Sequence, residues 1–103
     1  MKTFPKKRVD IMVEAPLLNR VLGILDEQGV TGYTVLAALA GRGNDGSWHR
    51  DGLVGRAGAV VQVFCILDES RIDQVVEPLF KLVSKQIGIV TISDVQVIRP
   101  EHF

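Results

Sequence analysis

Gly41, Arg42 and Gly43 are the residues whose types and spacing most directly indicate chemistry. Glycines on both sides of an arginine leave the backbone N–H groups uncovered, and successive exposed N–H groups bind anions. The guanidinium of Arg42 adds a planar, permanently charged donor that suits phosphate or a carboxylate-like oxyanion. A flexible turn without a ligand is the alternative interpretation. Arg56, later in the same segment, is expected either to close on a bound anion or to face solvent.

These residues belong to a glycine-rich segment, residues 41–58, which holds six of the ten glycines in the chain. Loops longer than about 12–15 residues are uncommon in compact domains and are usually functional or disordered. Trp48 within it favours a partner contact, while His49 is expected to be a solvated loop residue. The segment has no second His or Cys at ligand spacing and no nucleophile–base pair, so we expect neither a metal site nor catalytic residues. We interpret it as a ligand-gated loop that binds an anion.

Two further groups of residues are candidates for ligand contacts. Gly32 would let a ligand approach the backbone, and Thr34 offers a hydroxyl; an ordinary turn is the alternative. Near the end of the chain, Arg99, Glu101 and His102 form a second charged group, which lies at a subunit edge or in a frayed tail.

The elements that must position these residues follow from hydrophobic periodicity. Alternation and apolar runs predict strands, and apolar stripes at helical spacing predict helices. Strands are expected at residues 7–14, 33–40, 59–67 and 89–98, with helices between Pro16 and Gly29 and between Ser70 and Gly88. Two strand–helix–strand units make an α+β, ferredoxin-like βαββαβ sandwich, so residues 1–103 are expected to form a single domain.

The second helix is less regular than the first. Asp68 or Ser70 is expected to cap it, and Ser70 with Asp73 is close to a capping box. Pro78 predicts either a kink or a split into two helices. The expected buried stripe consists of Ile72, Val75, Val76, Leu79, Phe80 and Val83.

The predicted sheet has more apolar surface than two helices can cover. Residues 59–67 are apolar on both faces, with Val61, Val63, Cys65 and Leu67 on one and Val60, Phe64 and Ile66 on the other. An open apolar face several strands wide exceeds the few hundred Å² that monomers usually expose. We therefore expect an oligomer that packs sheet against sheet around an axis. The alternative is that Met12, Gln62 and Gln96 make this face wet enough to stay exposed.

Composition limits the possible partners and compartments. Twelve Lys and Arg balance twelve Asp and Glu, so no overall charge draws the chain to nucleic acid or to a membrane. The basic residues 1–8 are not followed by the apolar region of a signal peptide, and no apolar run reaches the roughly 20 residues of a transmembrane helix. The single cysteine, Cys65, is expected to be a small buried hydrophobe in a reducing cytoplasm.

Three short motifs and their order resemble those of a known family. They are Gly29-Val30-Thr31-Gly32-Tyr33-Thr34-Val35, Gly41-Arg42-Gly43 and Gly88-Ile89-Val90, with segments 63–73 and 94–99 in the same order. With these motifs the chain resembles the PII family of trimeric signalling proteins. It looks most like the PII-like branch linked to inorganic carbon: the carboxysome-associated protein that binds adenine nucleotide and bicarbonate, and the regulator of bicarbonate transporters.

The resemblance implies a homotrimer with nucleotide sites in the clefts between subunits and a T-loop at about residues 41–58. Gly88 is followed by Ile89 where the family usually has a lysine, so ADP or AMP is expected to bind at least as well as ATP. The implied bicarbonate contacts are Gly41, Arg42, Gly43 and Arg56. The implied nucleotide contacts are Gly32, Tyr33, Thr34, Val35, Gly41, Arg42, Gly43, Phe64, Gly88, Ile89, Val90 and Arg99.

The resemblance also implies a sensor rather than an enzyme, without a cofactor, whose T-loop regulates a membrane bicarbonate transporter. It would bind neither nucleic acid nor the membrane interior. Two alternatives remain. One is a nitrogen-type PII protein that reads ATP and 2-oxoglutarate, which a loop without tyrosine disfavours because Tyr33 is the only tyrosine. The other is a small phosphate-ester hydrolase.

Overall fold

The computed structural model describes residues 1–43, 46–49 and 59–103. Within these ranges the strands are β1 (Phe4–Glu14), β2 (Thr34–Ala37), β3 (Ala40–Gly43), β4 (Gly46–His49), β5 (Val60–Leu67) and β6 (Gly88–Val97). The helices are α1 (Leu18–Glu27) and α2 (Ile72–Val83), each preceded by a short 3-10 helix, Ala15–Leu17 and Glu69–Arg71 respectively. The predicted order of strands and helices is thus found, with one additional hairpin.

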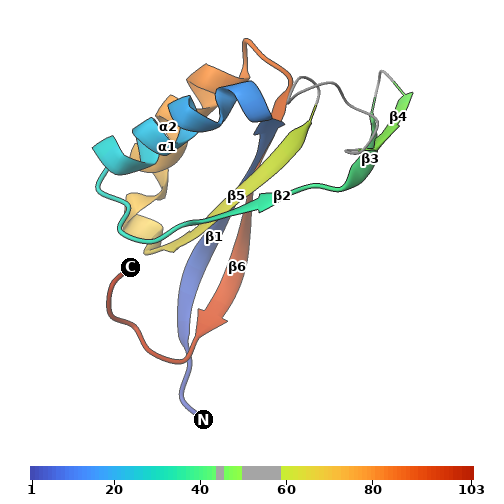
Figure 1. Ribbon diagram of the computed structural model, residues 1–103. Coiled ribbons are helices and arrows are strands. Elements are labelled where there is room, and N and C mark those ends of the chain that lie inside the picture. Colours follow the sequence, from blue (N-terminus) through green and yellow to red (C-terminus); the bar gives the residue numbers. More distant parts are fainter. Residues whose placement is uncertain (44–45, 50–58) are drawn as a thin grey trace.

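The main sheet has four antiparallel strands in the order β2-β5-β1-β6. Both helices cover one face of this sheet, and β3 and β4 pair separately as a hairpin beyond its end (Figure 1). Two strand–helix–strand units joined in this way form the ferredoxin-like arrangement. The predicted fold is therefore confirmed.

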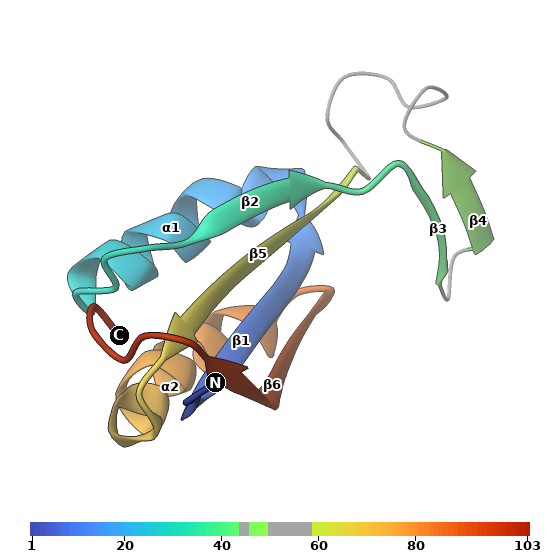
Figure 2. The ribbon, with the colours of Figure 1, turned by 90° about the horizontal axis from the view of Figure 1, so that it is seen from below.

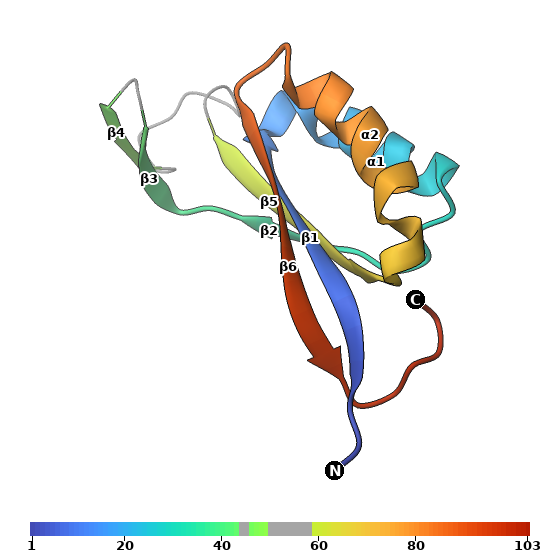
Figure 3. The same cartoon turned by 180° about the vertical axis from the view of Figure 1, so that it is seen from behind.

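The core lies between the helices and one face of the sheet. In β5 burial alternates strictly, and of its two apolar faces the one that points to the helices is buried: Val61, Val63, Cys65 and Leu67. Val9, Ile11 and Val13 of β1 lie on the same face, and α1 and α2 contribute Val21, Leu25, Val75 and Leu79. Each of these side chains contributes roughly 1.5–3 kcal/mol by leaving water. Neither α1 nor α2 lies on the opposite face of the sheet (Figure 3).

Helix α1 begins and ends as the sequence predicts. Pro16 lies in the 3-10 turn that leads into it, where its missing N–H needs no partner. Gly29 adopts φ 74°, and its N–H donates to the carbonyl of Asp26 at 3.1 Å, while that of Val30 donates to the carbonyl of Leu25 at 2.9 Å. This pair of bonds is a Schellman motif, which requires a left-handed residue at the position of Gly29.

Helix α2 differs from the prediction in its cap and its buried face. It is one continuous helix with Pro78 inside, so of the two predicted alternatives, a kink or a split, the split does not occur. The predicted capping box is wrong, because no side chain caps the helix and the Asp68 carboxylate pairs with Lys6 instead. Phe80 is 61% exposed, whereas Leu82, outside the predicted stripe, is only 8% exposed.

Three element boundaries also need correction, and the first is that β1 begins at Phe4 rather than residue 7. β2 ends at Ala37 rather than residue 40, because Ala40–Gly43 pairs with β4 instead of with the main sheet. Gly88 is the first residue of β6 and does not end α2, whose C-cap is Ser84. A Cβ at Gly88 would lie 3.1–3.2 Å from atoms of Val13, Met12 and Val83, so glycine permits the close approach of β6.

The expected loop at residues 41–58 is only partly described. Residues 41–43 and 46–49 belong to the β3–β4 hairpin, so this part is not irregular. Residues 44–45 and 50–58, including Arg56, lie outside the described residues.

Candidate functional site

A cleft of about 290 Å³ lies where the chain leaves α1 and enters β2. Thr34 lies opposite Phe64 in the register of β2 and β5, so the start of one strand and the middle of the other form its walls. The lining residues are Val30, Thr31, Gly32, Tyr33, Thr34, Phe64, Cys65, Ile66, Leu67, Arg71, His102 and Phe103. Four residues expected to contact a nucleotide, Gly32, Tyr33, Thr34 and Phe64, thus meet in one cleft.

Gly32 and Tyr33, which lead into β2, leave this cleft open. A Cβ built at Gly32 would meet no atom within 4 Å, so the space beside its backbone is free for a ligand. The hydroxyl of Tyr33 donates a hydrogen bond to the Asp26 carboxylate at 3.3 Å. Burial, followed by the nearby charge of Asp26, raises the pKa of Tyr33. The phenol therefore stays protonated as a donor.

The C-terminal segment closes the floor of the cleft, which the sequence did not reveal. After β6 the chain folds back toward the α1–β2 connection (Figure 2). The N–H of Asp68 donates to the backbone oxygen of Phe103 at 3.1 Å. Arg71 donates to the same oxygen at 3.5 Å and to the carbonyl of Gln28 at 2.7 Å. The tail is therefore held in place rather than frayed, and His102 lies in the cleft wall with φ 76°.

The burial of Cys65 fits a structural role beside the cleft. Its side chain points to the core and is 2% exposed. Burial raises the pKa of this thiol to about 11, so it remains protonated near neutral pH.

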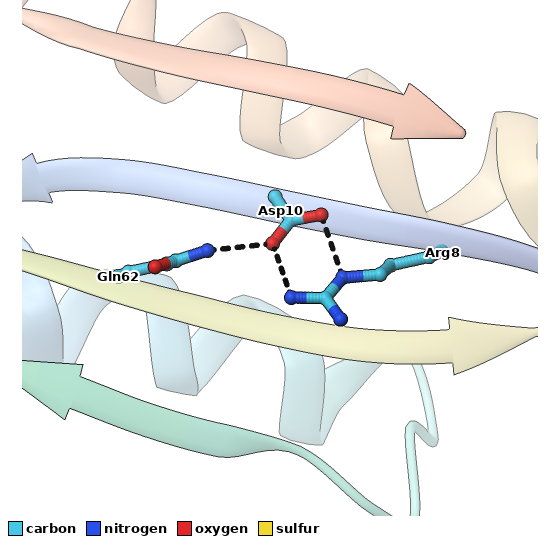
Figure 4. Close-up of polar contacts among 3 residues, drawn as sticks. All are labelled: Arg8, Asp10 and Gln62. Atoms are coloured by element: carbon cyan, nitrogen blue, oxygen red, sulfur yellow. Dashed lines mark hydrogen bonds and ion pairs between the residues drawn. The ribbon is translucent and has the colours of Figure 1, made fainter.

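A polar cluster occupies the uncovered face of the sheet next to the cleft (Figure 4). Arg8 donates two hydrogen bonds to the Asp10 carboxylate, at 2.9 and 3.0 Å, and Gln62 donates a third at 2.8 Å. The guanidinium carbon of Arg8 also lies 4.1 Å from the centre of the Phe64 ring. The Arg8 hydrogen bonds, assisted by Gln62, hold the pKa of Asp10 below its usual value. The pair is therefore charged at neutral pH.

A row of mainly apolar side chains crosses the same face. Leu36, Gln62, Met12 and Ile89 lie opposite one another across the four strands. Leu36 is 47% exposed, Met12 40% and Ile89 59%. Gln96 does not belong to this face, because it pairs with Pro5 and shares the alternation of the helix-facing residue Val9. The open face is thus apolar along one row and polar around Asp10.

The remaining candidates on the main sheet lie at the opposite edge. Gly88, Ile89 and Val90 belong to β6, whereas Thr34 belongs to β2, and β5 and β1 stand between these two strands. At about 4.8 Å per strand, three steps separate the two edges by roughly 14 Å. Arg99 follows the end of β6 at that same edge. Val35 belongs to β2 but faces the other way from Thr34, opposite Val63. One chain therefore does not gather all these residues around one ligand.

The Gly41-Arg42-Gly43 triplet is equally remote from the cleft. It forms β3, in a hairpin that projects from the end of the sheet farther from the cleft (Figures 1 and 2). Arg42 is exposed, lies opposite Ser47, and donates from Nε to its hydroxyl at 3.1 Å. The other guanidinium N–H groups of Arg42 have no hydrogen bond within residues 1–43, 46–49 and 59–103.

Two features are absent from the part of the chain that the structure describes. There, no three His, Cys, Asp or Glu residues gather as a metal site would require. None of the helices described has the length and apolarity to span a bilayer.

Comparison with solved structures finds this fold in PII-like proteins. CPII from Thiomonas intermedia K12, a nitrogen regulatory PII-like protein bound to ADP, AMP and bicarbonate, matches with TM-score 0.85 and 26% identity, over 96% of this chain and 93% of CPII. CPII bound to ADP and bicarbonate matches with TM-score 0.81 and 27% identity, over 96% and 94%. A PII-like signalling protein from Thermus thermophilus shares the fold, with TM-score 0.78 and 24% identity, over 96% and 95%.

Sequence comparison assigns the family. Among curated proteins there is no match. The model of the family described as nitrogen regulatory protein P-II matches residues 6–102, which is nearly the whole chain. This match agrees with the order of strands and helices and with the cleft at the start of β2. The chain therefore belongs to the P-II family.

Proposed function

We propose that this protein is a homotrimeric PII-like sensor that binds ADP or AMP and bicarbonate and regulates inorganic-carbon uptake. The observation that carries the proposal is the cleft formed by Gly32, Thr34 and Phe64. It lies within a fold that matches, over 96% of the chain, CPII bound to ADP, AMP and bicarbonate. We also propose that residues 1–103 form a single domain that acts in the cytoplasm.

The nucleotide site lies between two copies of the chain in this proposal. The cleft of about 290 Å³ is at the lower limit of the roughly 300–1,000 Å³ typical of ligand pockets. The other expected contacts, Gly88, Ile89, Val90 and Arg99, lie on or just after β6, at the opposite edge of the sheet. The β6 edge of a neighbouring subunit placed against the β2 edge would bring both sets to one ligand.

The open sheet face supports self-association. The row Leu36, Met12 and Ile89 needs an apolar cover, and neither α1 nor α2 lies on this side. Three copies that turn this face toward a common axis would bury it and leave the helices outside. The paired Arg8 and Asp10 satisfy each other, so their burial would not leave either charge without a partner.

The residues that the resemblance implies as nucleotide contacts have separate proposed roles. Phe64 provides an aromatic surface beside the base, and Thr34 a hydroxyl for base or ribose. Gly32 and Tyr33 form the strand entry over which the nucleotide lies, whereas Val35 faces the other side of the sheet from Thr34. The backbone amides of Gly88, Ile89 and Val90 and the guanidinium of Arg99 would come from the neighbour and bind phosphate. Without a lysine after Gly88, we propose that ADP and AMP bind at least as well as ATP.

The anion site of the proposal lies in the T-loop, at about residues 41–58. Gly41 and Gly43, together with the guanidinium of Arg42, are proposed to bind a small planar anion with one charge such as bicarbonate. Arg56 is proposed to join it. Fixing a residue costs roughly 1–2 kcal/mol of conformational entropy, so ligands that order the loop must offset this cost with new contacts.

The output of the sensor is the T-loop itself, which we propose docks on a membrane bicarbonate transporter. The ligands control docking only if they bind two loop states unequally. The protein acts in this proposal as a regulator and not as an enzyme.

Calorimetry of ADP binding with and without bicarbonate tests this function. We expect bicarbonate to tighten ADP binding, and by linkage ADP to tighten bicarbonate binding by the same factor. Chloride at matched ionic strength is the control. Equal ADP affinities with and without bicarbonate would contradict the coupling. Tighter binding of 2-oxoglutarate with Mg-ATP would support the nitrogen-type alternative, and multiple turnover of ATP would support a hydrolase.

A further inference from the structure

A second groove, larger than the nucleotide cleft, lies between the two helices. It measures about 520 Å³ and is lined by Arg20, Gly23, Ile24, Glu27, Pro78, Lys81, Leu82, Lys85 and Gln86. Both helices lie on the covered side of the sheet, opposite the open face (Figure 3). A trimer assembled through the open face would therefore leave this groove accessible.

The charges around the groove are mostly positive. Arg20, Lys81 and Lys85 line it, against the single carboxylate of Glu27. Nζ of Lys81 lies 3.5 Å from Oε1 of Glu77, one turn earlier in α2, and the two form a salt bridge. Within the described ranges, Arg20 and Lys85 make no salt bridge. The chain as a whole is neutral, so this is a local concentration of cations.

Three of the lining residues are poor choices for the helices that contain them. Gly23 lies within α1 and Pro78 within α2, where both weaken a helix. Arg20 lies in the first turn of α1, where the helix dipole disfavours a cation. The fold does not need glycine at position 23, because an added Cβ would meet no atom within 4 Å. Residues that oppose local structure without a packing reason concentrate at functional surfaces.

We propose that this groove is a docking site for an acidic segment of a partner protein. Gly23 allows the partner to approach the helix backbone, Ile24 and Leu82 provide an apolar floor, and the cations bind its carboxylates. Leu82 is the only buried side chain among the described lining residues, so the groove is too open to enclose a small molecule. A peptide lying along the two helices contacts the whole groove.

Fluorescence anisotropy with two labelled helical peptides tests the proposal on the full-length protein. One peptide contains Glu, Ala and Leu, and the second has Gln in place of every Glu. We expect the acidic peptide to bind, and Lys85→Glu and Gly23→Leu each to weaken it roughly tenfold. Leu favours a helix more than Gly does, so the second variant blocks the groove without endangering α1.

Lys2→Glu is the matched control, because Lys2 is exposed and lies outside the groove. It makes the same charge change and should leave peptide affinity unaltered. Equal binding of the acidic and Gln peptides would overturn the proposal. So would equal weakening by Lys2→Glu and Lys85→Glu, or binding to phosphatidylserine vesicles in place of the acidic peptide.

Discussion

The guanidinium of Arg8 lies over the ring of Phe64, with 4.1 Å between its central carbon and the ring centre. The same group donates two hydrogen bonds to Asp10, so a carboxylate fixes the cation above the ring. Phe64 also lines the cleft at the start of β2. One aromatic side chain therefore joins the polar cluster on the open face to the proposed nucleotide site.

Replacing Phe64 by Leu tests the contact with the base. A leucine fills similar space but cannot stack, and stacking of a base on an aromatic side chain is worth about 1–3 kcal/mol. We expect ADP affinity, measured by calorimetry, to fall roughly tenfold. Phe80→Leu is the control, since Phe80 is exposed on α2 and should not affect binding. Equal affinities for Phe64→Leu and the unaltered protein would show that the base lies elsewhere.

Replacing Gly32 by Val tests the strand entry. The added side chain meets no atom of its own chain near Cβ, so the free energy of unfolding should change by less than about 0.5 kcal/mol. The isopropyl group would instead occupy the space of the ligand, and ADP affinity should fall by more than about tenfold. Unfolding in urea and ADP titration measure the two effects separately. Normal ADP binding by a folded Gly32→Val protein would contradict the assigned site.

The pH dependence of stability tests the Arg8–Asp10 pair. The pKa of Asp10 lies below its usual 3.8, chiefly through the Arg8 hydrogen bonds. Its charge therefore stabilises the fold fully above that usual value, and this contribution disappears as pH falls through the lower pKa of the folded state. At neutral pH we expect Asp10→Asn to cost about 1–3 kcal/mol, and the difference from the unaltered protein to vanish in strong acid.

Urea unfolding at a fixed protein concentration measures this difference, since self-association also contributes to stability. Asp94→Asn is the control, because Asp94 pairs with Lys7 but is 83% exposed, and such pairs contribute about 0–1 kcal/mol. A cost for Asp10→Asn that persisted unchanged into strong acid would contradict the role of its charge.

Most of the fold could be predicted from periodicity. The alternation in β1 and the stripe of α1 determine which faces of these two elements are buried. β5 is apolar on both faces, and the buried face of α2 departs from its predicted stripe at Phe80 and Leu82. The errors lie where tertiary contacts decide. The Asp68 carboxylate does not cap α2, because it binds Lys6. Gly88 belongs to β6, because Val13 and Met12 approach it closely.

The candidate site was less predictable than the fold. Gly32 and Thr34 are close in sequence, so their grouping follows from a local motif. His102 and Phe103 reach the same cleft only because the tail folds back after β6, to where Arg71 donates to the oxygen of Phe103. No local pattern predicts a contact over such a sequence distance, and a short charged tail is equally typical of a frayed end.

Subunit mixing tests the central claim, that each nucleotide site combines the β2 edge of one copy with the β6 edge of another. Gly32→Val damages the first half and Arg99→Glu the second, so neither homotrimer should bind ADP well. Trimers refolded from a mixture of the two contain interfaces where an unaltered Gly32 meets an unaltered Arg99. We expect such mixtures to regain part of the ADP sites in calorimetry. Mixed trimers that bind no more ADP than the two parents would contradict a shared site.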